Sequence, residues 1–149
     1  MSEKREQLVK TALKLFYRDG IKSTGIDKVL AESGVAKMTM YNHFKSKDDL
    51  IVAALNRQHE FFINMIEKEI DKNGNPSKKV LSIFDAVHDW INSPKYRGCF
   101  FINTVAEFGS SNEKIQEICR EHKLVLYSRV ENLLKEGGQS HVKKKAIQL

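Results

Sequence analysis

Cysteine and proline are scarce in this chain. Its 149 residues include two cysteines, Cys99 and Cys119, and two prolines, Pro76 and Pro94. Neither cysteine belongs to a Cys-x-x-Cys pair or to a zinc-binding spacing, so the sequence predicts reduced thiols. Each proline falls in a predicted break between helices.

Long hydrophobic runs are absent as well. No apolar segment approaches the ~20 residues that a membrane-spanning helix needs. The first residues, Met-Ser-Glu-Lys-Arg-Glu, lack the apolar core of a signal peptide. With 41% hydrophobic and 30% charged residues, the composition is that of a soluble globular protein. We therefore expect no membrane partner and a cytoplasmic location.

The chain also lacks the motifs of common catalytic sites. It has no glycine-rich phosphate loop, nucleophile elbow or His-Glu metal motif, so we expect neither an enzyme nor a cofactor. Asp85, His88 and Asp89 could meet on one helical turn, but three ligands from one helix rarely complete a metal site. A solvated helix face explains these residues as well, and we expect no metal.

Positive charge is concentrated near the N-terminus. Residues 1–47 hold ten Lys or Arg and five Asp or Glu, a net charge of +5, whereas residues 48–149 hold fifteen and fourteen, a net charge of +1. This distribution is typical of a phosphate-binding segment, although solvated helices also carry modest positive surpluses.

Hydrophobic residues recur at helical spacing along most of the chain, and no convincing strand alternation interrupts them. Thr24 with Asp27, and Ser46 with Asp49, have the spacing of helix N-terminal caps. The pattern predicts an all-α fold. The expected helices cover residues 3–19, 24–33, 37–44, 47–72, a segment after Pro76 that ends before Ser93, residues 98–108 and 112–135, with a break at 109–111 and a short candidate helix at 142–149.

Residues 34–50 are the most informative segment. A turn at Gly34 follows one apolar-periodic helix and precedes another, which is the order of a helix-turn-helix. On the second helix Met40 and Phe44 stand four residues apart and can face inward. Its other side chains, namely Lys37, Met38, Thr39, Asn42 and His43, are then left outside, where they can reach a DNA major groove.

This segment also resembles a known family. Thr24-Gly25-Ile26-Asp27, followed by the sequence GVAKMTMYNHFKSK of residues 34–47, is similar to the DNA-binding region of TetR-type transcriptional regulators. The similarity runs without a gap from about Leu8 to Leu50. A shorter similarity, to the second domain of one branch of the family, covers Arg97–Asn103 and Glu107.

The resemblance implies a three-helix DNA-binding domain at residues 1–47 and a helical effector-binding and dimerisation domain at residues 48–149. The expected function is sequence-specific regulation, most simply by a homodimeric repressor that leaves a palindromic double-stranded DNA operator when a small-molecule effector binds. TetR-like chains usually continue with two more helices that form the dimer interface, and we expect the second domain to lack them. The alternative is a helical interaction module or adaptor that senses no effector.

Nine residues are candidates for DNA contact. Through the resemblance, Lys37, Met38, Thr39, Tyr41 and Asn42 correspond to positions that touch bases or nearby backbone. Lys37 can donate to guanine, Thr39 can contact thymine, and Asn42 can pair with adenine. The remaining candidates, which we interpret as phosphate anchors, are Ser23, Thr24, His43 and Lys47.

Effector and sensor candidates lie in the second half. Phe100, Asn103 and Glu107 share one helical stripe, and their polar groups must either bond to neighbouring helices or face a ligand. Phe62, Phe84 and Trp90 are further candidates for lining an effector pocket, and ordinary core packing is the alternative. Cys99 lies near Arg97 and a helix N-terminus and is a candidate redox sensor, the alternative being an inert buried thiol.

Overall fold

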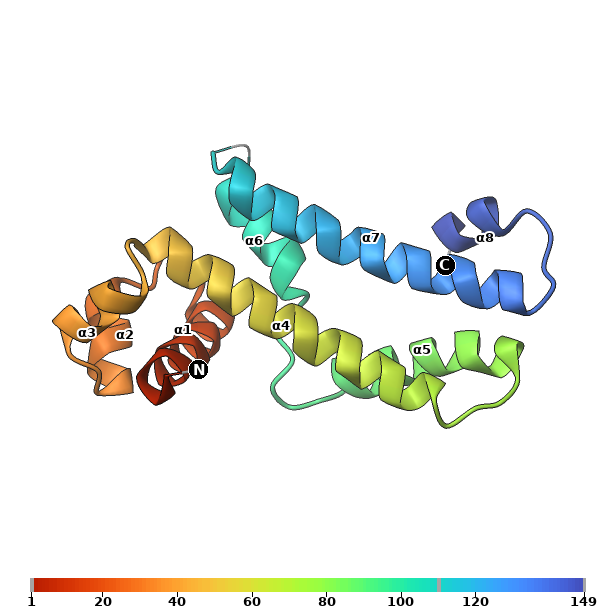
Figure 1. Cartoon of the computed structure of the whole chain (residues 1–149), viewed down its shortest axis with the longest axis horizontal. Helices are drawn as coiled ribbons and strands as arrows, with labels where there is room; N and C mark the ends of the chain where they lie inside the picture. The colour runs from red at the N-terminus through yellow and green to blue at the C-terminus, as the bar shows by residue number, and fades with distance from the viewer. Residues whose placement is uncertain (1, 110, 149) are drawn as a thin grey trace. The chain divides into compact units, whose positions relative to one another are not determined.

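A computed structural model of the chain describes residues 2–109 and 111–148, and all regular secondary structure in those residues is helical (Figure 1). This confirms the predicted all-α fold. The helices are α1 (Glu3–Asp19), α2 (Ile26–Ser33), α3 (Lys37–His43), α4 (Lys47–Ile70), α5 (Pro76–Ile91), α6 (Phe100–Phe108), α7 (Glu113–Glu136) and α8 (Val142–Gln148).

Several helix ends follow from local turn chemistry. Gly34 ends α2 in the left-handed conformation, with φ +65°, where a side chain would be strained. Ser46 Oγ accepts a hydrogen bond from the Asp49 amide at 3.1 Å and so caps α4, as predicted. At α5, Asn75 Oδ1 accepts from the amide of Ser77 at 2.9 Å, and Pro76 occupies the first turn.

Two of the predicted helix starts are wrong. Thr24 does not cap α2: Gly25 holds the N-cap position, and the fully buried Thr24 hydroxyl donates to the carbonyl of Gly20 at 2.7 Å. Helix α6 begins at Phe100 rather than Gly98, because Gly98 has φ +92° and cannot continue a right-handed helix.

Ser110, in the predicted break, and Leu149, at the predicted C-terminal end, lie outside the described residues.

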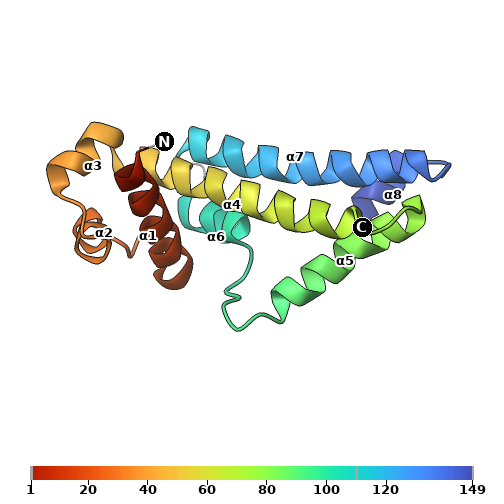
Figure 2. The ribbon, with the colours of Figure 1, turned by 60° about the horizontal axis from the view of Figure 1, so that its bottom comes forward.

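The chain forms two compact units. The first comprises Met1–His59 and Arg97–Cys119, and the second comprises Glu60–Tyr96 and Arg120–Leu149. Helices α1, α2 and α3 lie together in the first unit (Figures 1 and 2). The unit also contains α6 and the first part of α7. It therefore extends well beyond residue 47, where the DNA-binding domain was predicted to end.

The core of the first unit joins the N-terminal helices to α6 and α7. From α1, the fully buried Leu8, Ala12 and Leu15 repeat at helical spacing. They belong to one cluster with Met40 and Phe44 of the helix-turn-helix, Leu50 and Leu55 of α4, Phe100 and Phe101 of α6, and Ile115 and Cys119 of α7. The helix-turn-helix therefore shares its core with residues more than 50 positions away.

The second unit has its own core. It contains Phe62, Ile66 and Ile70 of α4, Val80 and Ala86 of α5, Leu133 and Leu134 of α7, and Ala146 of α8. The ring centroids of Phe62 and Trp90 are 5.2 Å apart in an edge-to-face arrangement, which is a favourable geometry for aromatic packing.

A missing cap at α3 gives a first prediction. Ala36 holds the N-cap position with extended backbone angles, φ −64° and ψ 144°, and no side chain caps the helix. Ala36→Ser supplies an acceptor for the free amides of the first turn and should raise the free energy of unfolding by about 0.5–1 kcal/mol. Chemical denaturation compares it with Ala31→Ser, an exposed site inside α2, where serine should give no gain. Equal gains at both sites would contradict the capping explanation.

Candidate nucleic-acid interface

Helix α3 exposes both polar and apolar side chains on its outer face. Lys37, Met38, Tyr41 and Asn42 are exposed, and Met38 keeps 75% of its surface accessible. On the opposite side, Met40 is fully buried in the core of the first unit. The inward and outward faces agree with the predicted pattern except at Thr39 and His43, which are half-buried.

The turn before α2 is held by residues from distant helices. Lys47 Nζ, on α4, donates to the carbonyl of Ile21 at 2.7 Å. Burial lowers the pKa of Lys47, and the negative charges of Glu107 and Asp48 oppose that shift. The half-buried Lys47 ammonium is therefore already engaged, whereas the side chain of Ser23 is exposed on the same turn.

The end of α3 meets the beginning of α1. His43 Nε2 lies 3.4 Å from Ser2 Oγ, and its ring packs edge-on to Phe44. The guanidinium of Arg5 lies over the Phe44 ring, 5.1 Å from its centroid, at cation–π distance. The N-terminal turn of α1 and its N-cap therefore contribute basic and polar groups next to the end of α3.

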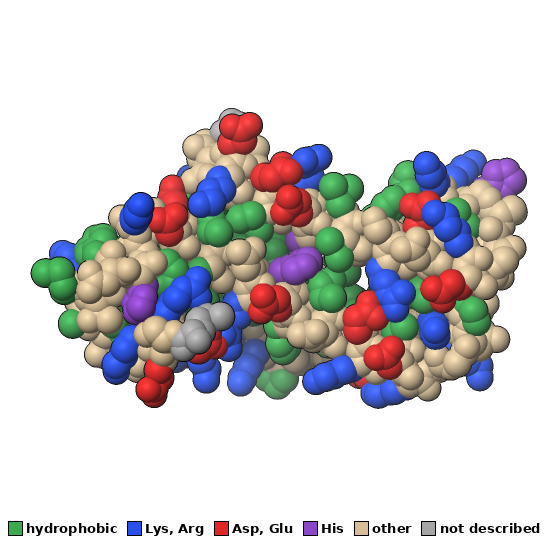
Figure 3. All heavy atoms as spheres, viewed as in Figure 1, with side chains coloured by type: hydrophobic (Ala, Val, Ile, Leu, Met, Phe, Trp, Pro, Cys, Tyr) green, Lys and Arg blue, Asp and Glu red, His purple; other side chains and the backbone are tan. Residues whose placement is uncertain are grey.

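Part of the positive charge near the N-terminus is paired. Lys14 Nζ lies 2.6 Å from Glu32 Oε1. Asp19 forms ion pairs with both Arg18 and Lys28, at 2.7 and 2.9 Å. The hydrogen bond from Arg18, followed by that from Lys28, holds the pKa of Asp19 far below its usual range. Acidic and basic side chains are also interspersed on the face drawn in Figure 3.

Glu107, a predicted effector contact, bonds to the backbone of the turn after α1. Its carboxylate oxygens accept hydrogen bonds from the amides of Ile21 at 3.0 Å and Lys22 at 2.7 Å. A Cβ on Gly20 would lie 3.4 Å from Glu107 Oε1, so the carboxylate packs closely on this turn. Of the two alternatives raised by the sequence, bonding to neighbouring elements is the one that the structure shows for Glu107.

A second bridge joins α1 to the segment before α6. The hydroxyl of Tyr17 donates to the carbonyl of Gly98 at 2.8 Å and accepts from the amide of Arg97 at 2.9 Å. Asn103 Nδ2 donates to the carbonyl of Arg97 at 3.0 Å, which fixes the same segment. Phe100 is buried in the core of the first unit, with its ring centroid 6.0 Å from that of Tyr17.

The six predicted effector contacts do not form one set within either unit. Phe100, Asn103 and Glu107 belong to the first unit, where they brace the turn and fill the core. Phe62, Phe84 and Trp90 belong to the second, where Phe62 is buried but Phe84 is 44% exposed on α5.

The two thiols and the Asp85, His88 and Asp89 cluster of α5 were the candidates for a redox sensor and a metal site. Cys99 is half-buried at the N-cap of α6, and Cys119 is buried in the core of the first unit. His88 and Asp89 are exposed, with His88 Nδ1 3.5 Å from Asp89 Oδ1. Within the described residues, no group of three or more His, Cys, Asp or Glu side chains is arranged to hold a metal ion.

Comparisons with known proteins agree with the geometry of the N-terminal helices. Residues 8–54, which include all of α2 and α3, match the family described as bacterial regulatory proteins, tetR family. A TetR-family transcriptional regulator from Streptomyces coelicolor has the same fold with a TM-score of 0.85 and 34% identity, over 90% of this chain and 66% of that structure. The chain belongs to the tetR family.

Other tetR-family similarities extend the comparison. The uncharacterized HTH-type transcriptional regulator YerO of Bacillus subtilis is 37% identical over 86 residues, which are 54% of this chain and 28% of YerO. A TetR transcriptional regulator from Chloroflexus aurantiacus shares the fold over 97% of this chain and 77% of its own, with a TM-score of 0.88. The chain spans between 28% and 62% of the length of four curated relatives that it matches. Among the described residues, no helix is long and apolar enough to cross a membrane.

Sequence reasoning did not find the two bridges to α6 in this tetR-family chain. Tyr17 and Gly98 are 81 positions apart, and Ile21 and Glu107 are 86 apart. Local periodicity carries no information on such pairs. The only signal was the presence of a carboxylate among apolar residues, which requires a partner without identifying it.

Proposed function

We propose that this protein is a sequence-specific DNA-binding transcriptional regulator, acting in the cytoplasm as a repressor released by a small-molecule effector, and that it has no catalytic role. The outer face of α3 carries the proposal. Lys37 and Asn42 offer the donors and acceptors that read guanine and adenine edges, while the exposed Met38 offers an apolar contact for a thymine methyl group.

The remaining candidate contacts take two roles. Tyr41, Ser23 and His43 lie at or near the surface and are suited to phosphate or backbone contact, and the half-buried Thr39 offers its hydroxyl at the edge of the face. Thr24 and Lys47 contribute by shaping the turn, because the hydroxyl of Thr24 and the ammonium of Lys47 are bonded to the carbonyls of Gly20 and Ile21.

Selection of preferred DNA from a random pool with the purified chain tests this proposal. We expect a palindromic site, because a homodimer presents two recognition helices related by a two-fold axis. Binding to that site should exceed binding to scrambled DNA and should fall with salt as counterions are released. Failure to enrich any sequence, together with equal binding to scrambled DNA, would favour a general interaction module instead.

The proposed effector response uses the continuity of α4. This helix runs from the first unit into the second without a break, so a change in its path alters the separation of two recognition helices in a dimer. Half-sites one helical turn apart require a separation of roughly 34–36 Å. An effector then needs only to favour a different separation, and by linkage operator DNA weakens effector binding by the same factor.

Cys99 gives a prediction on redox response. Its half-buried thiol at the N-cap of α6 is more accessible than that of Cys119. If oxidation of the Cys99 thiol to a sulfenic acid releases DNA, Cys99→Ser should abolish the loss of binding caused by hydrogen peroxide, which is reduced to water, whereas Cys119→Ser should not. Gel-shift assays before and after treatment, with the modified thiols counted by mass spectrometry, measure this. Full DNA binding by wild-type protein whose Cys99 is verifiably modified would contradict it.

A further inference from the structure

The packing of α8 leaves lysines on the surface of the second unit. This helix has the sequence VKKKAIQ; Ala146 is buried in the core of the unit, and Val142 packs against the same cluster. Residues four apart lie on one helical face, so these two point inward. Lys143 and Lys144 are left on the exposed side. Figure 3 accordingly shows basic side chains gathered over α8, at the upper right.

A pocket lies between α8 and the end of α7. Its volume is about 460 Å³, within the range of small-molecule sites, ~300–1,000 Å³. We call it the α8 pocket, and its walls are Glu131, Lys135, His141, Val142, Lys143 and Lys144. All six residues belong to the second unit, so the α8 pocket is built within one compact body.

The α8 pocket has an excess of positive charge. Lys135 Nζ lies 2.6 Å from Glu131 Oε1, which neutralises the carboxylate of the lining. Within the described residues, neither Lys143 nor Lys144 forms an ion pair or a side-chain hydrogen bond. Three ammonium groups therefore accompany one carboxylate, which leaves a net charge of +2 before any contribution from His141.

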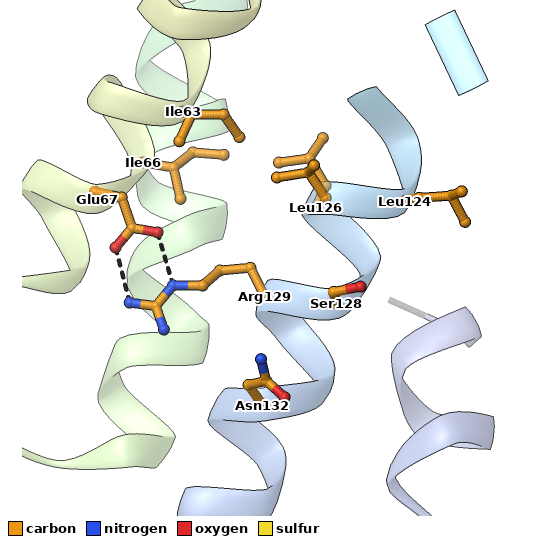
Figure 4. Close-up of a pocket in the computed structure, with 9 residues that line it drawn as sticks. Ile63, Ile66, Glu67, Leu124, Leu126, Ser128, Arg129 and Asn132 are labelled. Atoms are coloured by element: carbon orange, nitrogen blue, oxygen red, sulfur yellow. Dashed lines mark hydrogen bonds and ion pairs between the residues drawn. The ribbon is translucent and has the colours of Figure 1, made fainter. Parts of the chain in front are cut away.

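Other cations of the second unit have already found acidic partners. Arg129 Nε and Nη2 each donate to one carboxylate oxygen of Glu67 at 2.7 Å (Figure 4). Lys79 Nζ lies 4.0 Å from Glu136 Oε2. The two lysines of α8 differ from these residues, because their charge is still available to a ligand.

The amount of charge narrows the class of anion. A carboxylate, or an internal phosphate of DNA, carries one negative charge. A phosphate monoester carries about −1.5 to −2 at pH 7 and offers three strong acceptor oxygens, so it matches the excess charge and the three ammonium donors. The volume leaves room for an organic group beside the phosphate, against Val142 and the methylene stems of the lysines.

We infer that the α8 pocket binds a phosphate monoester, with the phosphate at the ammonium groups of Lys135, Lys143 and Lys144 and the organic group against Val142. This inference goes beyond the proposed function and does not depend on it. Binding requires only the second unit and can be measured without DNA.

Isothermal titration calorimetry on the full chain tests the inference, with phenyl phosphate as the probe. Phenyl sulfate has nearly the same shape but a single negative charge, and inorganic phosphate lacks the organic group. We expect saturable binding of phenyl phosphate at one site per chain and weaker binding of the other two anions, because neither matches both the charge and the apolar wall of the α8 pocket.

Substitutions locate the site. Lys143→Gln and Lys144→Gln each remove one charged donor and should weaken phenyl phosphate binding about tenfold. Glu131→Gln removes the competing carboxylate and should strengthen it. Lys78→Gln and Lys123→Gln, at exposed sites on α5 and α7 outside the α8 pocket, are matched controls and should bind as wild type. Circular dichroism checks that each variant is folded.

Vesicles distinguish two sources of the same chemistry. Cosedimentation with phosphatidylcholine vesicles containing phosphatidic acid, reversed by phenyl phosphate, would identify a lipid headgroup as the ligand. Absence of cosedimentation, together with phenyl phosphate binding, would identify a soluble ester. Either result supports a phosphate monoester site.

Several results would overturn the inference. They are no saturable heat with phenyl phosphate, phenyl sulfate binding as tightly as phenyl phosphate, or equal losses in the pocket variants and the control variants. If phenyl phosphate does not bind and Lys143→Gln instead weakens the binding of scrambled DNA, the lysines form a DNA-contact surface and the inference is wrong.

Discussion

Replacing Asn42 or Lys37 by alanine should weaken binding to the preferred DNA site by about 1–3 kcal/mol, because each substitution removes a base contact. Both side chains are exposed on α3, so neither substitution disturbs the core of the first unit. Binding to scrambled DNA should change little, since most of that affinity comes from phosphate contacts elsewhere. Fluorescence anisotropy with specific and scrambled duplexes at one salt concentration measures both quantities.

Exposed asparagine and lysine residues in the second unit provide matched controls. Asn64→Ala and Lys123→Ala change the same residue types on α4 and α7 and should bind both duplexes as wild type. The assignment of base contacts to α3 fails if Asn42→Ala loses equal affinity for specific and scrambled DNA. It also fails if Asn64→Ala gives the same loss as Asn42→Ala.

Glu107→Ala should destabilise the first unit by about 1.5–3 kcal/mol, because two backbone amides lose a charged acceptor. The amides of Ile21 and Lys22 donate to this carboxylate, so their hydrogen exchange should accelerate far more than that of amides inside α1. Glu107→Gln keeps one oxygen acceptor and should lie between wild type and alanine. Hydrogen exchange followed by NMR measures each amide separately.

A second glutamate separates this specific role from a general charge effect. Glu113 is exposed at the start of α7, and Glu113→Ala should leave the exchange of the Ile21 and Lys22 amides unchanged. An effector-lining role for Glu107 makes the opposite prediction, namely a lost ligand response with unchanged amide exchange. Observing that pattern would favour the alternative that Glu107 faces a ligand.

The helices themselves were largely predictable because their determinants are local. Apolar spacing in α1, the left-handed Gly34 and the cap at Ser46 each involve residues within about one or two turns, which a single sequence displays. The outer face of α3 was predictable for the same reason, since burying Met40 and Phe44 leaves most of the other side chains outside.

Interactions between distant segments account for what the sequence did not predict. Thr24 has the spacing of a cap, but its hydroxyl finds a better-placed partner in the Gly20 carbonyl once the turn forms. Lys47 looks like a free phosphate anchor until the fold brings the Ile21 carbonyl to its ammonium. Glu67 and Arg129 are 62 positions apart, and no local pattern indicates the ion pair that they form between α4 and α7.

The first unit is assembled from two separate stretches of chain, and this limits where the chain can be cut to give a fragment with a complete core. Of the three places where the chain passes between units, those after His59 and Cys119 fall within α4 and α7, and only the one after Tyr96 lies between helices. A fragment ending at residue 47 or 59 would lack Phe100, Phe101, Ile115 and Cys119 from its core. Exchange of DNA-reading modules between such proteins should therefore require that residues 97–119 be transferred together with the N-terminal helices.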